Sequence, residues 1–122
     1  MSMYFKDSEF ACRCCGELPP NGMNSVLLEK LDTLREMACE PVYVTCGYRC
    51  PKHNADVGGV PNSQHTLGTA CDIYCNNLSV DELAELAKVA GFDGIGRYYK
   101  QEFVHVDVRS NGCEPAVYQW TD

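Results

Sequence analysis

Apolar residues recur with a helical period in two stretches of the chain. In residues 24–39, NSVLLEKLDTLREMAC, they fall three and four positions apart. In residues 79–91, SVDELAELAKVAG, Ser79 and Glu82 have the spacing of a capping box, and Gly91 ends the segment. These patterns predict two amphipathic helices that each bury one face.

Alternation of apolar and polar residues predicts four short strands, at residues 42–46, 69–75, 94–99 and 103–109. In the second, TACDIYC, the period of two puts Asp72 on one face and Cys71 and Ile73 on the other. By the same parity, Cys75 shares the face of Asp72. We therefore expect Cys71 and Ile73 in the core and Asp72 on the opposite side of the strand.

The first two predicted strands are separated by residues 47–63, which are rich in Gly, Pro and Asn. This composition predicts a long irregular segment with one short helical turn after Pro51, and loops of that length commonly carry function. The order of elements predicts an α+β fold, a small antiparallel sheet with helices packed on it. At 122 residues, the chain is expected to form a single domain, residues 1–122.

Charge and hydropathy exclude some classes of partner. The formal net charge is -7, and the ten Lys and Arg residues are scattered, so we expect no nucleic-acid partner. No stretch approaches the roughly 18 apolar residues of a membrane span, and the N-terminus lacks the pattern of a signal peptide. We therefore expect a protein that is cytoplasmic on synthesis and monomeric.

Histidine and carboxylate residues have the arrangement of a catalytic zinc site, which needs three protein ligands and one open position. His65 and Asp72 lie seven residues apart, where a loop leads into a strand. A third ligand must come from a distant segment. In FVHVDVR, residues 103–109, the three valines form one apolar face, which leaves His105 and Asp107 on the other.

Four longer stretches carry a resemblance to a known family. CGYRCPKHN, VGGVPNSQHTLGTACDI, GIGRYY and FVHVDVR occur in this order, and SxHxxGxAxD is followed by a later HxD. In these motifs, from about Phe5 to Arg109, the chain resembles the zinc D-Ala-D-Ala carboxypeptidase family. That family includes peptidoglycan peptidases, phage endolysins and vancomycin-resistance D-Ala-D-Ala dipeptidases, and it is similar in fold to the hedgehog signalling domain.

The resemblance implies one catalytic Zn²⁺ bound by His65, Asp72 and His105. It also implies that Arg49 holds the substrate, either by pairing with the terminal carboxylate of a peptide or by stabilising the carbonyl oxygen as negative charge develops. Ser63 matches a serine that contacts the substrate in the family.

Two carboxylates compete for the role of general base. Glu102 stands three residues before His105, where many relatives carry an acidic base. Residues three apart on a regular strand face opposite ways, so Glu102 must reach the site from the preceding turn or through a bulge. Asp107 shares the face of His105, where it would act as the base or orient that histidine. We favour Glu102.

The resemblance implies a zinc metallopeptidase that hydrolyses stem peptides of bacterial peptidoglycan, as a D-Ala-D-Ala carboxypeptidase or an endolysin-type endopeptidase. The apparent lack of a signal peptide or wall-binding module fits a phage or prophage lysis enzyme that acts on the cell wall after release. It fits a cytoplasmic dipeptidase equally well. The alternative is a non-catalytic, zinc-stabilised binding domain of the same fold.

The chain contains nine cysteines, an odd number that cannot all pair within one molecule. We expect mostly reduced thiols that are buried as small apolar groups, with a disulfide or a second metal cluster as alternatives. In the spacing of these cysteines we recognise no structural zinc signature. A redox protein or thiol peptidase is disfavoured, because no cysteine has a distinctive nucleophile context.

Overall fold

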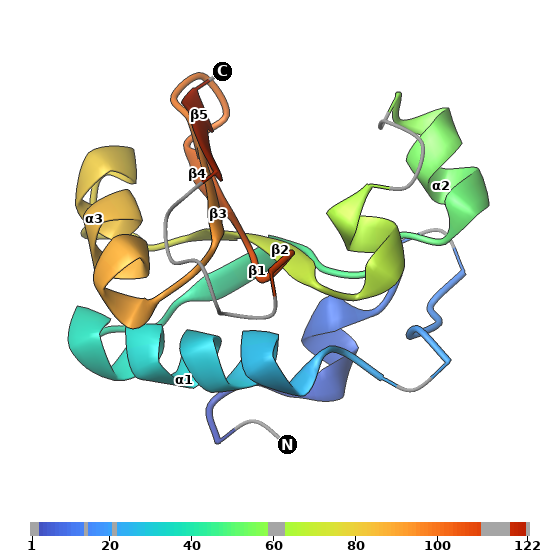
Figure 1. The fold of residues 1–122 in the computed structure, drawn as a ribbon, viewed down its shortest axis with the longest axis horizontal. Helices are drawn as coiled ribbons and strands as arrows, with labels where there is room; N and C mark the ends of the chain where they lie inside the picture. The colour runs from blue at the N-terminus through green and yellow to red at the C-terminus, as the bar shows by residue number, and fades with distance from the viewer. Residues whose placement is uncertain (1–2, 14, 21, 59–62, 111–117, 122) are drawn as a thin grey trace.

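The computed structural model describes residues 3–13, 15–20, 22–58, 63–110 and 118–121, which form a mixed sheet with helices on both faces (Figure 1). In chain order the elements are η1 (Asp7–Phe10), α1 (Ser25–Ala38), β1 (Tyr43–Cys46), α2 (Pro51–Asp56), η2 (Gln64–Leu67), β2 (Ala70–Tyr74), α3 (Val80–Ala90), β3 (Gly94–Tyr98), β4 (Phe103–Asp107) and β5 (Tyr118–Thr121). The predicted α+β fold class is confirmed. None of the described helices is long and apolar enough to cross a membrane.

The sheet has the strand order β1-β2-β4-β3-β5. The four predicted strands are present and pair antiparallel. The fifth strand, β5, was not predicted, and it pairs parallel to β3. The sheet is therefore mostly antiparallel with one parallel edge. Because β4 lies at the centre, its two faces separate the hydrophobic core from the candidate site.

Both long helices begin and end where their capping residues predict. The Asn24 carboxamide oxygen accepts hydrogen bonds from the backbone N–H groups of Val26 and Leu27 at the start of α1. Ser79 and Glu82 form a reciprocal capping box at the start of α3. Gly91 ends α3 in the left-handed conformation, with a φ of 98° that glycine adopts without steric cost.

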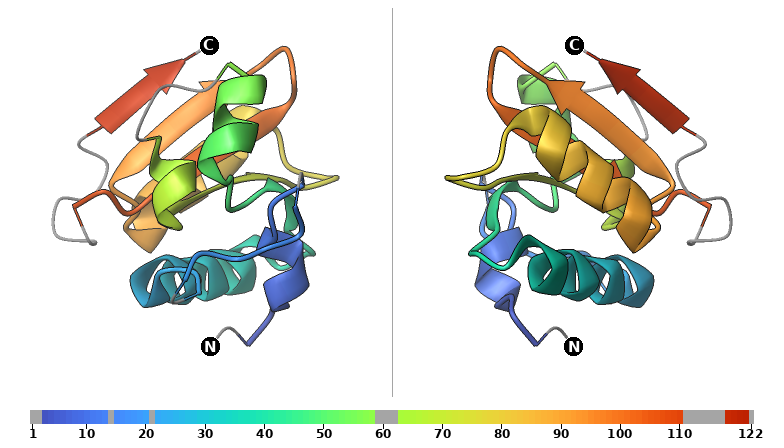
Figure 2. Two further views of the ribbon diagram at one scale, coloured as in Figure 1. Left: turned by 90° about the vertical axis from the view of Figure 1, so that its right-hand side faces the viewer. Right: turned by 90° about the vertical axis from the view of Figure 1, so that its left-hand side faces the viewer.

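The hydrophobic core lies between the sheet and the helices α1 and α3. The valines of β4 that were expected on one face are buried there, and Cys71 and Ile73 of β2 lie beside them with no exposed surface. Figure 2 shows α3 in front of the sheet in one view and α2 with η2 in front in the opposite view. The second face of β2 and β4 therefore points toward α2 and η2.

Cys75 does not follow the predicted parity. Strand β2 ends at Tyr74, and Cys75 turns into the hydrophobic core with 7% of its surface exposed. The alternation of faces holds only while the backbone stays extended, so it does not apply one residue beyond the strand.

Candidate metal centre

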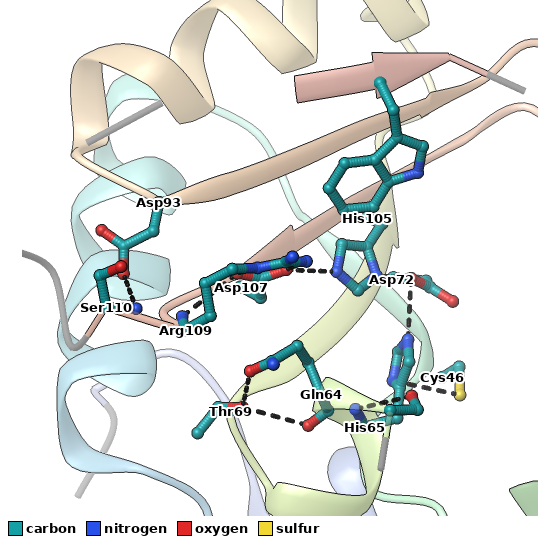
Figure 3. Close-up of polar contacts among 12 residues, drawn as sticks. Cys46, Gln64, His65, Thr69, Asp72, Asp93, His105, Asp107, Arg109 and Ser110 are labelled. Carbon is teal, nitrogen blue, oxygen red and sulfur yellow. Dashed lines mark hydrogen bonds and ion pairs between the residues drawn. The ribbon is translucent and has the colours of Figure 1, made fainter. Parts of the chain in front are cut away.

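The three predicted zinc ligands meet on the face of the sheet opposite the core (Figure 3). Asp72 of β2 pairs directly with His105 of β4, and His65 lies in η2, just before β2. One carboxylate oxygen, Asp72 Oδ1, lies 3.1 Å from His105 Nδ1 and 3.3 Å from His65 Nε2. Tetrahedral zinc with bonds of about 2.0–2.1 Å separates its ligand atoms by about 3.3 Å. Both distances from Asp72 Oδ1 match that separation, whereas the three residues here whose ligand atoms all lie within 4.8 Å of one another are Cys46, His65 and Asp72.

Fixed acceptors determine which nitrogen of each imidazole carries hydrogen. His65 Nδ1 donates to the Gly47 carbonyl oxygen at 2.8 Å. His105 Nε2 donates to Asp107 Oδ2 at 2.8 Å. Because a carbonyl and an ionised carboxylate only accept, these contacts make His65 Nε2 and His105 Nδ1 the nitrogens that face Asp72, with a lone pair in the neutral ring and an N–H donor in the protonated one.

The electrostatics of the cluster favour positive charge between the imidazoles. Burial opposes protonation of His65, but hydrogen bonds with Asp72 and Cys46 outweigh it and raise its pKa to about 9. Burial also opposes ionisation of Asp72, yet hydrogen bonds from His105 and His65 lower its pKa to about 2. The pKa of His105 is raised despite its burial, through Asp107 and Asp72. A metal cation would satisfy the same preference.

Asp107 is hydrogen-bonded to His105 on the side of the ring away from Asp72. It has no exposed surface. Its carboxylate accepts from Arg109 at 2.9 Å and 2.6 Å in addition to His105. Burial opposes ionisation of Asp107, but these hydrogen bonds lower its pKa to about 2. A side chain at Gly94 would collide with this carboxylate, so glycine makes room for it.

Glu102 is not brought to the cluster. It lies in the turn between β3 and β4, exposed and in the left-handed conformation with a φ of 59°. Its side chain lines a second pocket with Tyr74 and Tyr99, whereas the neighbouring Gln101 lines the pocket of the cluster. Of the two candidate bases, the structure places only Asp107 beside His105.

The cluster lies in a cavity of about 600 Å³ that both predicted substrate-binding residues line. The Arg49 backbone N–H donates to the His65 carbonyl at 3.1 Å, which holds the arginine beside a ligand. Its side-chain Nε is buried and has no hydrogen-bond partner among the described residues. Ser63 Oγ accepts from the His65 backbone N–H at 3.1 Å, as an N-cap of η2.

The wall of the cavity includes residues that the sequence analysis did not identify. Trp120 of β5 lies over Gly96, its ring centroid is 5.0 Å from that of His105, and its Nε1 donates to Tyr98 Oη at 3.0 Å. The Arg109 guanidinium stacks on the Trp120 ring at 5.2 Å. The only available signal was the aromatic alternation YQW in residues 118–120.

Cys46 is a further potential donor beside the cluster. Its Sγ lies 3.7 Å from His65 Nδ1, and Cys46, His65 and Asp72 have ligand atoms within 4.8 Å of one another. The sulfur approaches the side of the ring that donates to Gly47, away from the nitrogen that faces Asp72. The ligand set His65, Asp72 and His105 stays a prediction, with Cys46 as a further donor beside it.

Comparison with known proteins gives the same family as the motifs. Residues 3–107 match the model of the family described as Peptidase M15. The chain belongs to the peptidase M15 family. Among curated proteins, this M15 chain is 35% identical over 71 residues to the zinc D-Ala-D-Ala carboxypeptidase of Streptomyces albus G. The match covers 57% of the chain and 28% of that relative, so the chain spans less than a third of the relative's length.

Proposed function

We propose that this M15 family chain is a zinc metallopeptidase that hydrolyses stem peptides of bacterial peptidoglycan. The observation that carries the proposal is the convergence of His65 Nε2 and His105 Nδ1 on one oxygen of Asp72, inside a cavity that Arg49 also lines. Two specific activities fit, that of a D-Ala-D-Ala carboxypeptidase and that of an endolysin-type endopeptidase. The name of the curated relative supports the first.

His65, Asp72 and His105 would hold the zinc ion, which supplies an activated nucleophile and a Lewis acid for the scissile carbonyl. The protein contributes fixed orientation. The Gly47 carbonyl and the Asp107 carboxylate hold the two imidazoles, so no rotation of either ring is needed before metal binds.

Arg49 would bind the substrate through its guanidinium. A buried nitrogen without a partner is costly, and a peptide carboxylate or a developing oxyanion would satisfy it with a charge-assisted hydrogen bond. Ser63 would contact the same substrate from the neighbouring wall of the cavity, through an Oγ that also caps η2.

Glu102 remains our proposed general base, and the structure adds a condition. The turn between β3 and β4 must rearrange so that the carboxylate leaves the second pocket and faces the cluster. A left-handed conformation is unfavourable for glutamate by about 1–2 kcal/mol, so a change at this residue can also relieve strain. Catalytic contacts commonly tighten only when substrate is bound. Asp107 is the alternative, although His105 and Arg109 already occupy its oxygens.

The site of action follows from the proposed substrate. Stem peptides lie in the bacterial cell wall, so we propose that the protein acts there after release, as a phage or prophage lysis enzyme would. A cytoplasmic dipeptidase of the same chemistry is the second possibility. The two differ in whether the substrate is a wall-linked stem or a free dipeptide.

Purified protein incubated with peptidoglycan fragments and with free D-Ala-D-Ala tests the proposal. Mass spectrometry should detect released D-Ala or cut stems, a chelator should abolish the product, and added zinc should restore it. If no chelator-sensitive product forms from any of these substrates, the peptidase proposal is wrong.

The base is tested by Glu102→Gln, with Lys100→Ala, an exposed residue of the same turn that lines neither pocket, as the matched control. Loss of a general base costs about 10²- to 10⁴-fold in rate. We expect that loss in the Glu102 variant with full metal content, and little change in the Lys100 variant. Equal activity of both variants would remove Glu102 from the mechanism.

One observation favours a second candidate function. Because Glu102 lines a different pocket from the metal ligands, the described conformation also fits a non-catalytic, zinc-stabilised binding domain. Such a domain would bind stem peptides through Arg49 and release no product. Calorimetric binding of a stem peptide without turnover would favour this function over the peptidase.

A further inference from the structure

Three cysteine sulfurs cluster outside the histidine and carboxylate site. Cys12, Cys15 and Cys50 have Sγ atoms that all lie within 4.8 Å of one another. Cys12 is buried, Cys50 is half-buried and Cys15 is exposed. Two of them follow η1 near the N-terminus and the third directly precedes α2, so 34 residues of chain lie between Cys15 and Cys50.

We propose that Cys12, Cys15 and Cys50 form a second, structural metal site that binds zinc or a divalent cation of similar softness as thiolates. Tetrahedral zinc with Zn–S bonds of about 2.3 Å places neighbouring sulfurs about 3.8 Å apart. The observed cluster has that scale. Three thiolates would supply three of the four ligands that structural zinc takes, and they differ from the His and Asp donors of the first site.

The backbone around the cluster is already arranged to hold thiolates. The Cys50 backbone N–H donates to Cys12 Sγ at 3.4 Å, and the His53 N–H donates to Cys50 Sγ at 3.4 Å. Hydrogen bonds from backbone N–H groups favour the charged form of an acceptor. These two sulfurs therefore have donors aimed at them before any cation is bound.

A closed turn brings the first two cysteines together. The Cys12 N–H donates to the Glu17 carbonyl, and the Gly16 N–H donates to the Cys12 carbonyl, both at 2.8 Å. Gly16 has a φ of 73°, which closes the turn at no steric cost. Cys12 and Cys15 are spaced as C-x-x-C, so the expectation that the cysteines carry no structural zinc signature is wrong on the sequence itself.

The sulfur cluster joins the N-terminal segment to the segment that carries Arg49. The Tyr48 N–H donates to the Phe10 carbonyl at 2.8 Å, and a Cβ on Gly47 would lie 2.6 Å from Phe10 Cα. Cys50 follows Arg49 directly. A cation held by the three sulfurs would therefore cross-link two distant segments next to the wall of the cavity, where it stabilises the position of Arg49.

Metal analysis under reducing conditions tests the site, by comparison of the wild-type protein with Cys12→Ser/Cys50→Ser. We expect this variant to contain one fewer zinc ion per chain than wild type. Cys39→Ser is the matched control, because Cys39 is exposed at the end of α1, away from the cluster, and should leave the zinc content unchanged. The same zinc content in all three proteins would overturn the proposal.

Cobalt provides a readout that does not depend on how the cysteine variant folds. In the His65→Ala/His105→Ala variant the first site is removed, so bound Co²⁺ should still give a thiolate-to-cobalt charge-transfer band in the near ultraviolet. Absence of that band from this variant and from wild type would overturn the proposal, as would a protein mass two hydrogens lower from a disulfide within the cluster. Neither result bears on peptidase activity, so the two proposals fail separately.

Discussion

The two candidate metal sites are built on different parts of the fold. The histidine cluster, His65, Asp72 and His105, rests on two paired strands and on η2 just before them, and each of its imidazoles has a fixed acceptor. The sulfur cluster, Cys12, Cys15 and Cys50, rests on a turn and on the start of a short helix. Strand pairing holds the first geometry without metal, whereas the second joins segments that fewer backbone contacts connect.

This difference teaches which property each cation controls. Where strand pairing already orders the ligands, a bound metal supplies chemistry and contributes little to folding stability. Where the metal closes a long loop, its binding free energy contributes to folding. We therefore expect the histidine cluster to determine activity and the sulfur cluster to determine stability near the N-terminus.

The largest expected effect is on activity, from Asp72→Ala. This change removes the oxygen that both imidazoles share, so the peptidase rate should fall by more than about 10³-fold, because the metal supplies both nucleophile and Lewis acid. Kinetic assays with stem peptides measure the rate, and metal analysis should show that the sulfur cluster keeps its zinc. Loss of both metal ions would mean that the two sites are not independent.

Asp107→Asn should weaken zinc binding at the histidine cluster alone. The variant loses the charge that holds His105 Nε2 and Arg109, and changes of this kind cost about 10- to 100-fold in metal affinity. Competition with a chromophoric chelator measures the affinity. Asp56→Asn, an exposed carboxylate paired with Lys52, is the control and should bind zinc as wild type does. An unchanged affinity in the Asp107 variant would contradict its positioning role.

Gly47→Ala should lower the stability of the protein and weaken zinc binding at the sulfur cluster. The added methyl group would meet the Phe10 backbone at 2.6 Å and push the N-terminal segment away, at a cost of about 1–3 kcal/mol in unfolding free energy. Chemical denaturation measures the cost, and faster zinc release from the sulfur cluster should accompany it. Gly58→Ala is strained by a φ of 74° although a Cβ there meets nothing within 4 Å, so it should lower stability without speeding this release. Equal release rates in the two variants would contradict an effect of Gly47 on the sulfur cluster.

The smallest effect is on the pH dependence of stability in metal-free protein. The pKa of His65 is raised from an ordinary value near 6.5 to about 9, so its stabilising contribution is full below about pH 6.5 and disappears as the pH rises through about 9. The pKa of Asp72 is lowered to about 2, so its contribution is present above about pH 4 and disappears as the pH falls through about 2.

The Tm of chelator-treated protein should accordingly fall between pH 6.5 and pH 9. Zinc-loaded protein should not show this fall, because the metal replaces the proton between the imidazoles. His65→Asn lacks the titrating ring and should show a shallower slope after chelation. The same slope in this variant as in wild type would assign the pH dependence to other groups.

The two sites also differ in how far they could be predicted from the sequence. The face shared by His105 and Asp107 follows from the strand period of two, and the pairing of Asp72 with His105 agrees with it. Glu102 lies in a turn, where no period applies, and its side chain lines another pocket. Trp120 belongs to β5, which the local pattern did not predict. It lines the cavity from this edge strand, which pairs parallel to β3.

The sequence by itself determined the two capped helices, four of the strands, the family and the three residues proposed to bind zinc. These depend on local periodicity and on motif spacing, which act over a few residues. Only the tertiary structure decided which nitrogen of each imidazole faces Asp72, and that Cys50 meets Cys12. Such contacts join residues that lie far apart along the chain, where packing and strand register, not local preference, set the distance.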